Sequence, residues 1–90
     1  MGSTQGLYKI YEILNDFNRI RILACLNKKE KTIDEIANDI NLSKTIILSQ
    51  LEYLKRYNII IQKEKEETIF FKIRDREFLK IVNNITNYVN

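Results

Sequence analysis

Residues 32–58 carry the pattern that most restricts how this chain can fold. Thr32 and Glu35 form a Thr-x-x-Glu capping box, which satisfies the free backbone N–H groups at the start of a helix. Apolar residues follow at helical spacing as far as Asn41, a residue type that tolerates the left-handed backbone of a sharp turn. Ser43 can cap a second helix, whose buried face is expected at Ile47, Leu51 and Leu54. The segment therefore predicts a helix-turn-helix, with Lys44, Thr45, Ser49 and Glu52 left available to a partner.

The composition excludes several classes of protein. The chain has 90 residues, one cysteine and no histidine. This length gives one domain with a small core, so a dimer is expected to add stability. Without a second cysteine there is no internal disulfide, and without histidine the usual tetrahedral zinc sets cannot form within one subunit. Because it also lacks a Gly-rich phosphate cradle and a carboxylate pair in an apolar setting, the chain is predicted to be no enzyme and to need no metal or cofactor.

The ends and turns of the domain are expected at particular residues. Residues 1–6, Met-Gly-Ser-Thr-Gln-Gly, read as a disordered leader or as residues added for expression, which leaves one domain over residues 7–90. Gly and Pro are absent from Leu7 onward, so turns are expected at Asn27, Asn41 and Asn58. The chain has no apolar run of about 18 residues and no signal-peptide pattern, which predicts a cytoplasmic protein with no membrane partner.

The remaining periodicity predicts helices before the motif and a hairpin after it. A first helix is expected over residues 7–14 and a second, capped by Asp16, as far as Leu26, followed by a polar loop over residues 28–31. The period then changes to two, which predicts strands over residues 59–64 and 68–73. The alternating apolar positions are Ile59 and Ile61 in the first strand and Ile69, Phe71 and Ile73 in the second. Residues 65–67 would form a loose tip, because Asn-Gly is absent.

Asp75 can cap a last helix that carries more apolar residues than one small domain needs to bury. Either this helix closes the core from two sides or it meets a second subunit. The second alternative is favoured, because two-fold dimers are the commonest assembly and the first helix offers a similar apolar stripe. The homodimer interface is expected at Leu7, Ile10, Tyr11, Phe78, Ile81, Val82, Ile85 and Tyr88.

The order helix, helix, helix-turn-helix, hairpin, helix is that of a winged-helix domain, and over residues 7–90 the chain resembles the ArsR family of small dimeric repressors. Leu14-Asn-Asp-Phe-Asn-Arg-Ile-Arg-Ile-Leu23 is similar to the family's Leu-Ala-Asp-Pro-Thr-Arg-Leu-Arg-Ile-Leu. Asn41-Leu-Ser-Lys-Thr-Ile-Ile-Leu-Ser-Gln-Leu51 is similar to its Gly-Leu-Ser-Gln-Ser-Thr-Val-Ser-His-His-Leu, and Leu54-Lys-Arg-Tyr-Asn-Ile-Ile60 to its Leu-Arg-Glu-Ala-Gly-Leu-Val. The resemblance implies a mainly α fold with a small hairpin, in the order α-α-α-α-β-β-α.

The resemblance also implies binding to double-stranded DNA, but not metal sensing. Members that sense metal often carry Cys-x-Cys before the turn, where this chain has Thr32 and Asp34, and the histidine of a second metal site is absent. The leading function is therefore a sequence-specific, dimeric transcriptional repressor on a pseudo-palindromic promoter site. The alternative is a winged-helix module that docks another protein with weak or no DNA binding. It stays open because the hairpin tip is nearly neutral and because Ile46 and Leu48 occupy usually polar positions.

The expected DNA contacts lie on the second motif helix, whose N-terminal half would enter the major groove, and on the hairpin. They are Ser43, Lys44, Thr45, Leu48, Ser49, Gln50, Lys55, Arg56, Lys63, Lys65 and Lys72. The net charge of +3 is compatible with nucleic acid without being diagnostic, and Leu48 can touch a thymine methyl group or simply pack.

Three further residues have two readings each. Arg19 and Arg21 can touch the DNA backbone or pair with a carboxylate such as Asp16, and pairing is favoured. Cys25 is either a redox sensor that forms an intersubunit disulfide or a buried core cysteine, and the core role is favoured.

Overall fold

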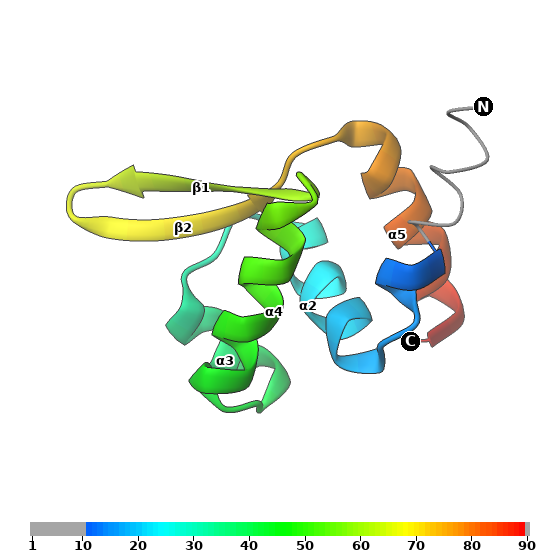
Figure 1. Cartoon of the computed structure of the whole chain (residues 1–90), viewed down its shortest axis with the longest axis horizontal. Coiled ribbons are helices and arrows are strands. Elements are labelled where there is room, and N and C mark those ends of the chain that lie inside the picture. Colours follow the sequence, from blue (N-terminus) through cyan, green and yellow to red (C-terminus); the bar gives the residue numbers. More distant parts are fainter. Residues whose placement is uncertain (1–10, 90) are drawn as a thin grey trace.

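The computed structural model describes residues 11–89, and their order of elements is the predicted one (Figure 1). Residues 11–14 are helical and are called the first helix below. Then follow α2 (Phe17–Lys28), α3 (Ile33–Ile40), α4 (Lys44–Arg56), β1 (Ile60–Lys65), β2 (Thr68–Ile73) and α5 (Arg76–Val89). The antiparallel strands form a hairpin that projects from the helical body, with α3 and α4 beneath it and α5 on the far side of α2 (Figure 1). No helix within this part of the chain is long and apolar enough to cross a membrane.

The predicted helix starts are confirmed, because each proposed capping side chain accepts a backbone N–H of the following first turn; these residues are Asp16, Thr32, Ser43 and Asp75. The capping box is complete, with Glu35 N donating to Thr32 Oγ1 at 3.1 Å and Thr32 N donating to Glu35 Oε1 at 2.9 Å. Asn41 takes the left-handed conformation, with φ 56° and ψ 49°, and ends α3. The tight turn of the motif therefore forms as its sequence predicts.

The core gathers around the predicted buried face of α4. Ile47, Leu51 and Leu54 are completely buried, and they pack with apolar residues from the other elements. These are Ile13, Ile22, Leu23, Cys25, Leu26, Ile36, Ile60, Phe71, Ile73 and Phe78. The core thus fixes which face of α4 remains outside.

The hairpin differs from its prediction in phase. β1 begins at Ile60, and Ile60, not Ile61, is the buried residue of this strand, opposite Ile73. The turn at Asn58 was predicted correctly. Its left-handed backbone, with φ 61°, reorients the chain so that Ile60, two residues later, faces the core. Ile69 lies beyond the core and is exposed. A one-residue change of phase exchanges the two faces of a strand, so the alternation predicted from Ile59 and Ile61 was wrong.

The predicted loose tip was also wrong. Lys65 pairs directly with Thr68, so only Glu66 and Glu67 form the turn. Both have left-handed backbones, with φ 51° and 66°, as a two-residue hairpin turn of the primed type requires. The twist of the paired strands imposes this geometry although neither residue is Gly or Asn.

The polar loop predicted over residues 28–31 is shorter than expected. α2 continues through Lys28, so Asn27 is helical and no turn occurs there; its side chain donates to Asn83 Oδ1 of α5 at 3.2 Å. Lys31 is only 8% exposed, because its backbone pairs with Phe71 of β2 through two hydrogen bonds of 3.0 and 2.8 Å. This pairing ties the hairpin to the start of the helix-turn-helix.

Only part of the expected dimer surface can be compared with the structure. Phe78 is buried within its own subunit, Ile81 is half-buried, and Tyr11 is 70% exposed. Leu7 and Ile10, and the side chains of Val82, Ile85 and Tyr88, lie outside the described residues. Phe78 therefore fills the core of one subunit and is not available to a partner, whereas Tyr11 is.

Candidate nucleic-acid interface

The outer face of α4 is the centre of the candidate site. Lys44, Thr45 and Ser49 are exposed there, opposite the three buried residues of the helix, as the sequence predicts. Ile46 and Leu48 are exposed beside them, at 42% and 46%. A helix with one buried face and an exposed N-terminal half carrying Lys, Thr and Ser has the form needed to enter a major groove.

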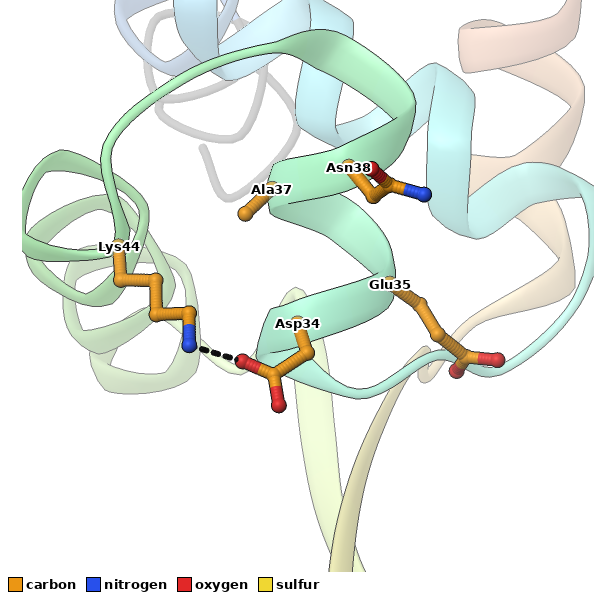
Figure 2. A pocket seen from close by; sticks show the side chains of 5 residues that line it. All are labelled: Asp34, Glu35, Ala37, Asn38 and Lys44. Carbon is orange, nitrogen blue, oxygen red and sulfur yellow. Dashed lines mark ion pairs between the residues drawn. The ribbon is translucent and has the colours of Figure 1, made fainter.

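Lys44 is held by a carboxylate of the preceding helix. Its Nζ lies 2.5 Å from Asp34 Oδ1, and Figure 2 shows the two side chains reaching toward each other from the starts of α4 and α3. A shallow pocket beside them is also lined by Glu35, Ala37 and Asn38 (Figure 2). Because both charged side chains are well exposed, this ion pair contributes only about 0–1 kcal/mol. Lys44 can therefore exchange Asp34 for a phosphate at little cost.

The three hairpin lysines lie on one face of the hairpin. Lys63 and Lys65 alternate along β1, and Lys72 pairs with Ile61 on the same side. Glu30 binds two of them, with 3.5 Å to Lys63 Nζ and 2.5 Å to Lys65 Nζ. The hydrogen bond from Lys65 is the main cause of the lowered pKa of Glu30, so this carboxylate stays charged and competes with phosphate for both lysines.

The far end of α4 carries a separate group of polar residues. Lys55 Nζ donates to Gln62 Oε1 of β1 at 2.9 Å and lies 3.4 Å from Glu52 Oε1, while Arg56 is exposed. Lys55 and Arg56 lie at the opposite end of α4 from Lys44. They can meet only a different part of a bound duplex.

The Gln50 side chain points toward the start of α2. Its side-chain amide binds Arg19 and Asp16 at the start of α2, so the structure does not bring it together with Lys44 and Thr45. Arg19 also pairs with Asp16 at 3.7 Å, which confirms the favoured reading of this arginine. Arg21 donates to the carbonyl oxygen of Ile40.

The sequence did not predict a groove that lies between α4, the hairpin and the start of α3. Ile33, Leu48, Ile69 and Phe71 provide its apolar wall, and the open groove has a volume of about 610 Å³. Its polar rim includes Thr32, Asp34, Glu52, Lys55, Gln62, Glu67 and Thr68. No sequence signal identified it, because it depends on the angle between the hairpin and α4.

Cys25 is buried in the core, as favoured from the sequence. Its Sγ donates to Asp39 Oδ2 at 3.4 Å, and the ammonium of Lys31 binds the same carboxylate. Burial and the nearby carboxylate raise the pKa of Cys25, whereas the hydrogen bond from Lys31 lowers that of Asp39. Among residues 11–89, no group of three or more Cys, Asp or Glu side chains is placed to hold a metal ion.

We expect Cys25 to react at least about tenfold more slowly with a disulfide reagent in the folded protein than in guanidinium, at neutral pH. The raised pKa reduces the thiolate fraction, and burial blocks the approach of the reagent. Release of the reagent chromophore measures the rate, and the denatured chain is the matched control. Equal rates in the two states would contradict a core role for this cysteine.

Three comparisons place the chain among known proteins. Residues 16–62 match the profile of the bacterial regulatory proteins of the arsR family. The chain is 26% identical over 81 residues, 90% of each protein, to the transcriptional repressor SdpR of Bacillus subtilis (strain 168).

The solved structures show the same fold. The crystal structure of a predicted DNA-binding transcriptional regulator from E. coli superposes with a TM-score of 0.89 at 16% identity, covering 97% of this chain and 93% of that one. The homodimeric winged helix-turn-helix DNA-binding domain of Mb0332 from Mycobacterium bovis gives 0.83 at 15% identity, covering 98% and 82%. The family profile covers α2, the helix-turn-helix and the start of β1, which is more than half of the chain. The chain therefore belongs to the arsR family of bacterial regulatory proteins and is a winged-helix transcriptional regulator, not an enzyme.

Proposed function

We propose that this regulator is a cytoplasmic, dimeric repressor that binds a pseudo-palindromic promoter site. The observation that carries the proposal is the outer face of α4, where Lys44, Thr45 and Ser49 are exposed above a completely buried inner face. The SdpR relative is a transcriptional repressor, which supports repression as the outcome of binding.

In this proposal α4 lies in the major groove and the hairpin lies along the adjacent backbone. Thr45 and Ser49 face base edges, and Leu48 lies where a thymine methyl group would come. Phosphates are contacted by Ser43, Lys44, Lys55, Arg56, Lys63, Lys65 and Lys72. Gln50 is not among these contacts, because its amide is already bound within the subunit.

The dimer follows from the limited reach of one subunit. In this proposal α4 is the recognition helix of each subunit. One recognition helix contacts only a few base pairs, whereas two such helices about 34 Å apart read successive major grooves on one face of DNA. The first helix and α5 are proposed as the interface, with exposed Tyr11 and half-buried Ile81 among its residues. The homodimeric domain from Mycobacterium bovis has the same fold, which supports a dimer.

Carboxylates neutralise part of the positive charge of the binding surface. Carboxylates stand next to the lysines that would meet phosphate, with Asp34 at Lys44, Glu52 at Lys55, and Glu30 at Lys63 and Lys65. Few counterions would therefore be released per subunit, and tight binding would need both half-sites. Non-specific binding depends on positive charge that meets phosphate. The partial neutralisation of this surface therefore favours sequence-specific over non-specific binding.

Selection of duplexes from a random DNA pool tests the proposal. We expect an enriched two-fold-related sequence whose affinity falls as salt rises, because the phosphate contacts of the two half-sites add. The alternative is a module that docks another protein, and exposed Leu48 and Ile69 beside the groove favour it. Weak binding at every salt concentration, with no enriched sequence, would reject the repressor and leave that alternative.

We expect Lys44→Ala to weaken binding to the selected duplex and to lower the salt slope by about one unit, because one phosphate contact is lost. Thr45→Ala should weaken binding while leaving the slope unchanged. Lys80→Ala, an exposed lysine on α5, is the charge-matched control. Unchanged affinity in both α4 variants, with the fold intact, would overturn this docking.

We also expect zinc, cadmium or arsenite to leave the affinity for the selected duplex unchanged. Thr32 and Asp34 stand where metal-sensing members of the family often carry thiolates, and the chain has no histidine. Titration of each ion into the protein–DNA mixture, followed by fluorescence anisotropy, measures this. A stoichiometric metal site that shifts DNA affinity would show that the ligand set has been misjudged.

A further inference from the structure

Arg19 lies at a junction of three elements. Its Nη1 donates to the carbonyl oxygens of Glu12 and Ile13, both at 3.1 Å, at the end of the first helix. Its own backbone N–H is bound by the Asp16 cap at the start of α2. Its Nε donates to Gln50 Oε1 of α4 at 2.9 Å. One guanidinium group therefore connects the first helix, α2 and the recognition helix.

Gln50 completes the junction from the side of α4. Its Nε2 donates to Asp16 Oδ2 at 3.3 Å while its Oε1 accepts from Arg19, so both ends of the amide are used. Tyr53, one helical turn later, lies under the guanidinium with 3.9 Å from Arg19 Cζ to the ring centroid. The Tyr53 hydroxyl donates to Glu12 Oε1 at 3.2 Å. α4 is thus held at two successive turns.

This junction has the properties of a rigid support. The Arg19 side chain is only 14% exposed, and a guanidinium presents its donors in a fixed plane. Holding Gln50 and Tyr53 together restricts both the rotation and the translation of α4. A recognition helix must be placed to within about 0.5 Å for its side chains to meet their targets.

We propose that Arg19 is a positioning residue for DNA binding and that Gln50 is its contact on the recognition helix, not a reader of bases. The proposal rests on the function proposed above. Because the first helix belongs to the proposed dimer interface, the junction also relates the orientation of α4 to the arrangement of the two subunits. Arg19 thus acts through α4 without touching DNA.

A reciprocal exchange of the two side chains tests the junction. Gln50→Glu alone places two carboxylates face to face across the 3.3 Å contact. Asp16→Asn alone keeps the cap through Oδ1 but turns an amide NH₂ group toward that of Gln50. In the double variant the new amide donates to the new carboxylate, which still accepts from Arg19 Nε. The net charge equals that of the wild type, so the overall attraction to phosphate is kept.

We expect each single variant to bind the selected duplex about tenfold more weakly, and the double variant to recover most of that loss. In the NMR spectrum, the Arg19 Nε–H signal should be protected from exchange in the wild type and the double variant. It should be exposed in Asp16→Asn, where the Gln50 amide turns its oxygen toward the new side chain at position 16 and its NH₂ group toward Arg19. Arg19→Lys keeps the charge but loses the planar fork, so it should also weaken binding about tenfold with no change in salt slope. Thermal unfolding of every variant separates loss of fold from loss of position.

Each outcome is decisive. If Gln50 reads bases directly, the double variant will bind as weakly as Gln50→Glu although its Nε–H signal is restored, and the proposal fails. If the Nε–H signal is unprotected in the wild type, the junction does not exist in solution and the proposal fails as well. If the signal behaves as expected but the wild type binds no duplex from the pool, the DNA-binding function is rejected, and a positioning role in DNA binding is rejected with it.

Discussion

Leu51→Ala is expected to lower the free energy of unfolding by about 3 kcal/mol, because a large core side chain leaves a cavity that its neighbours fill only in part. Leu51 is completely buried at the centre of α4, among apolar residues of the surrounding elements. For a domain of this size the melting temperature should fall by about 15 °C. Circular dichroism during heating and urea unfolding both measure the change.

Leu48→Ala is the matched control, since it makes the same substitution one turn earlier on the outer face of α4. Leu48 is nearly half exposed, so we expect a loss within about 1 kcal/mol. Similar losses in the two variants would mean that α4 is not seated with Leu51 inside. The face of α4 that carries Lys44, Thr45 and Ser49 would then not be its outer face.

Ile81→Glu is expected to convert the dimer to a monomer and to weaken binding to the selected duplex by at least about 100-fold, since a buried unpaired charge costs several kcal/mol. Ile81 is half-buried on α5, which packs against α2 and belongs to the proposed interface. Light scattering at micromolar concentration measures the mass, and fluorescence anisotropy measures the affinity.

Asn84→Glu introduces the same charge at an exposed position of α5 and should leave the dimer intact. Together the two variants separate the effect of position from that of added negative charge. A wild-type monomer that binds the selected duplex tightly would contradict the dimer outright. If the Asn84→Glu variant is monomeric instead, the interface also includes the side of α5 that carries Asn84.

Local chemistry along the chain was enough to predict the helix-turn-helix. Thr32, Glu35 and Ser43 satisfy backbone groups within four residues of themselves, so their roles follow from local chemistry. The segment has no glycine, and Asn41 is a residue type that tolerates the left-handed backbone of a turn. The buried face of α4 follows from the spacing of its apolar residues alone. These features were predicted correctly because each depends on neighbours along the chain.

Features that depend on residues far apart in the sequence could not be predicted and appear only in the folded chain. Ile60 faces the core because β1 pairs with β2 in one register, and Lys31 is buried because its backbone meets Phe71. Gln50 looked like a DNA contact from its place on α4, yet Asp16 and Arg19 hold its amide from 34 and 31 residues away. An exposed and a bound glutamine have the same helical periodicity, and only the contacts from Asp16 and Arg19 distinguish them.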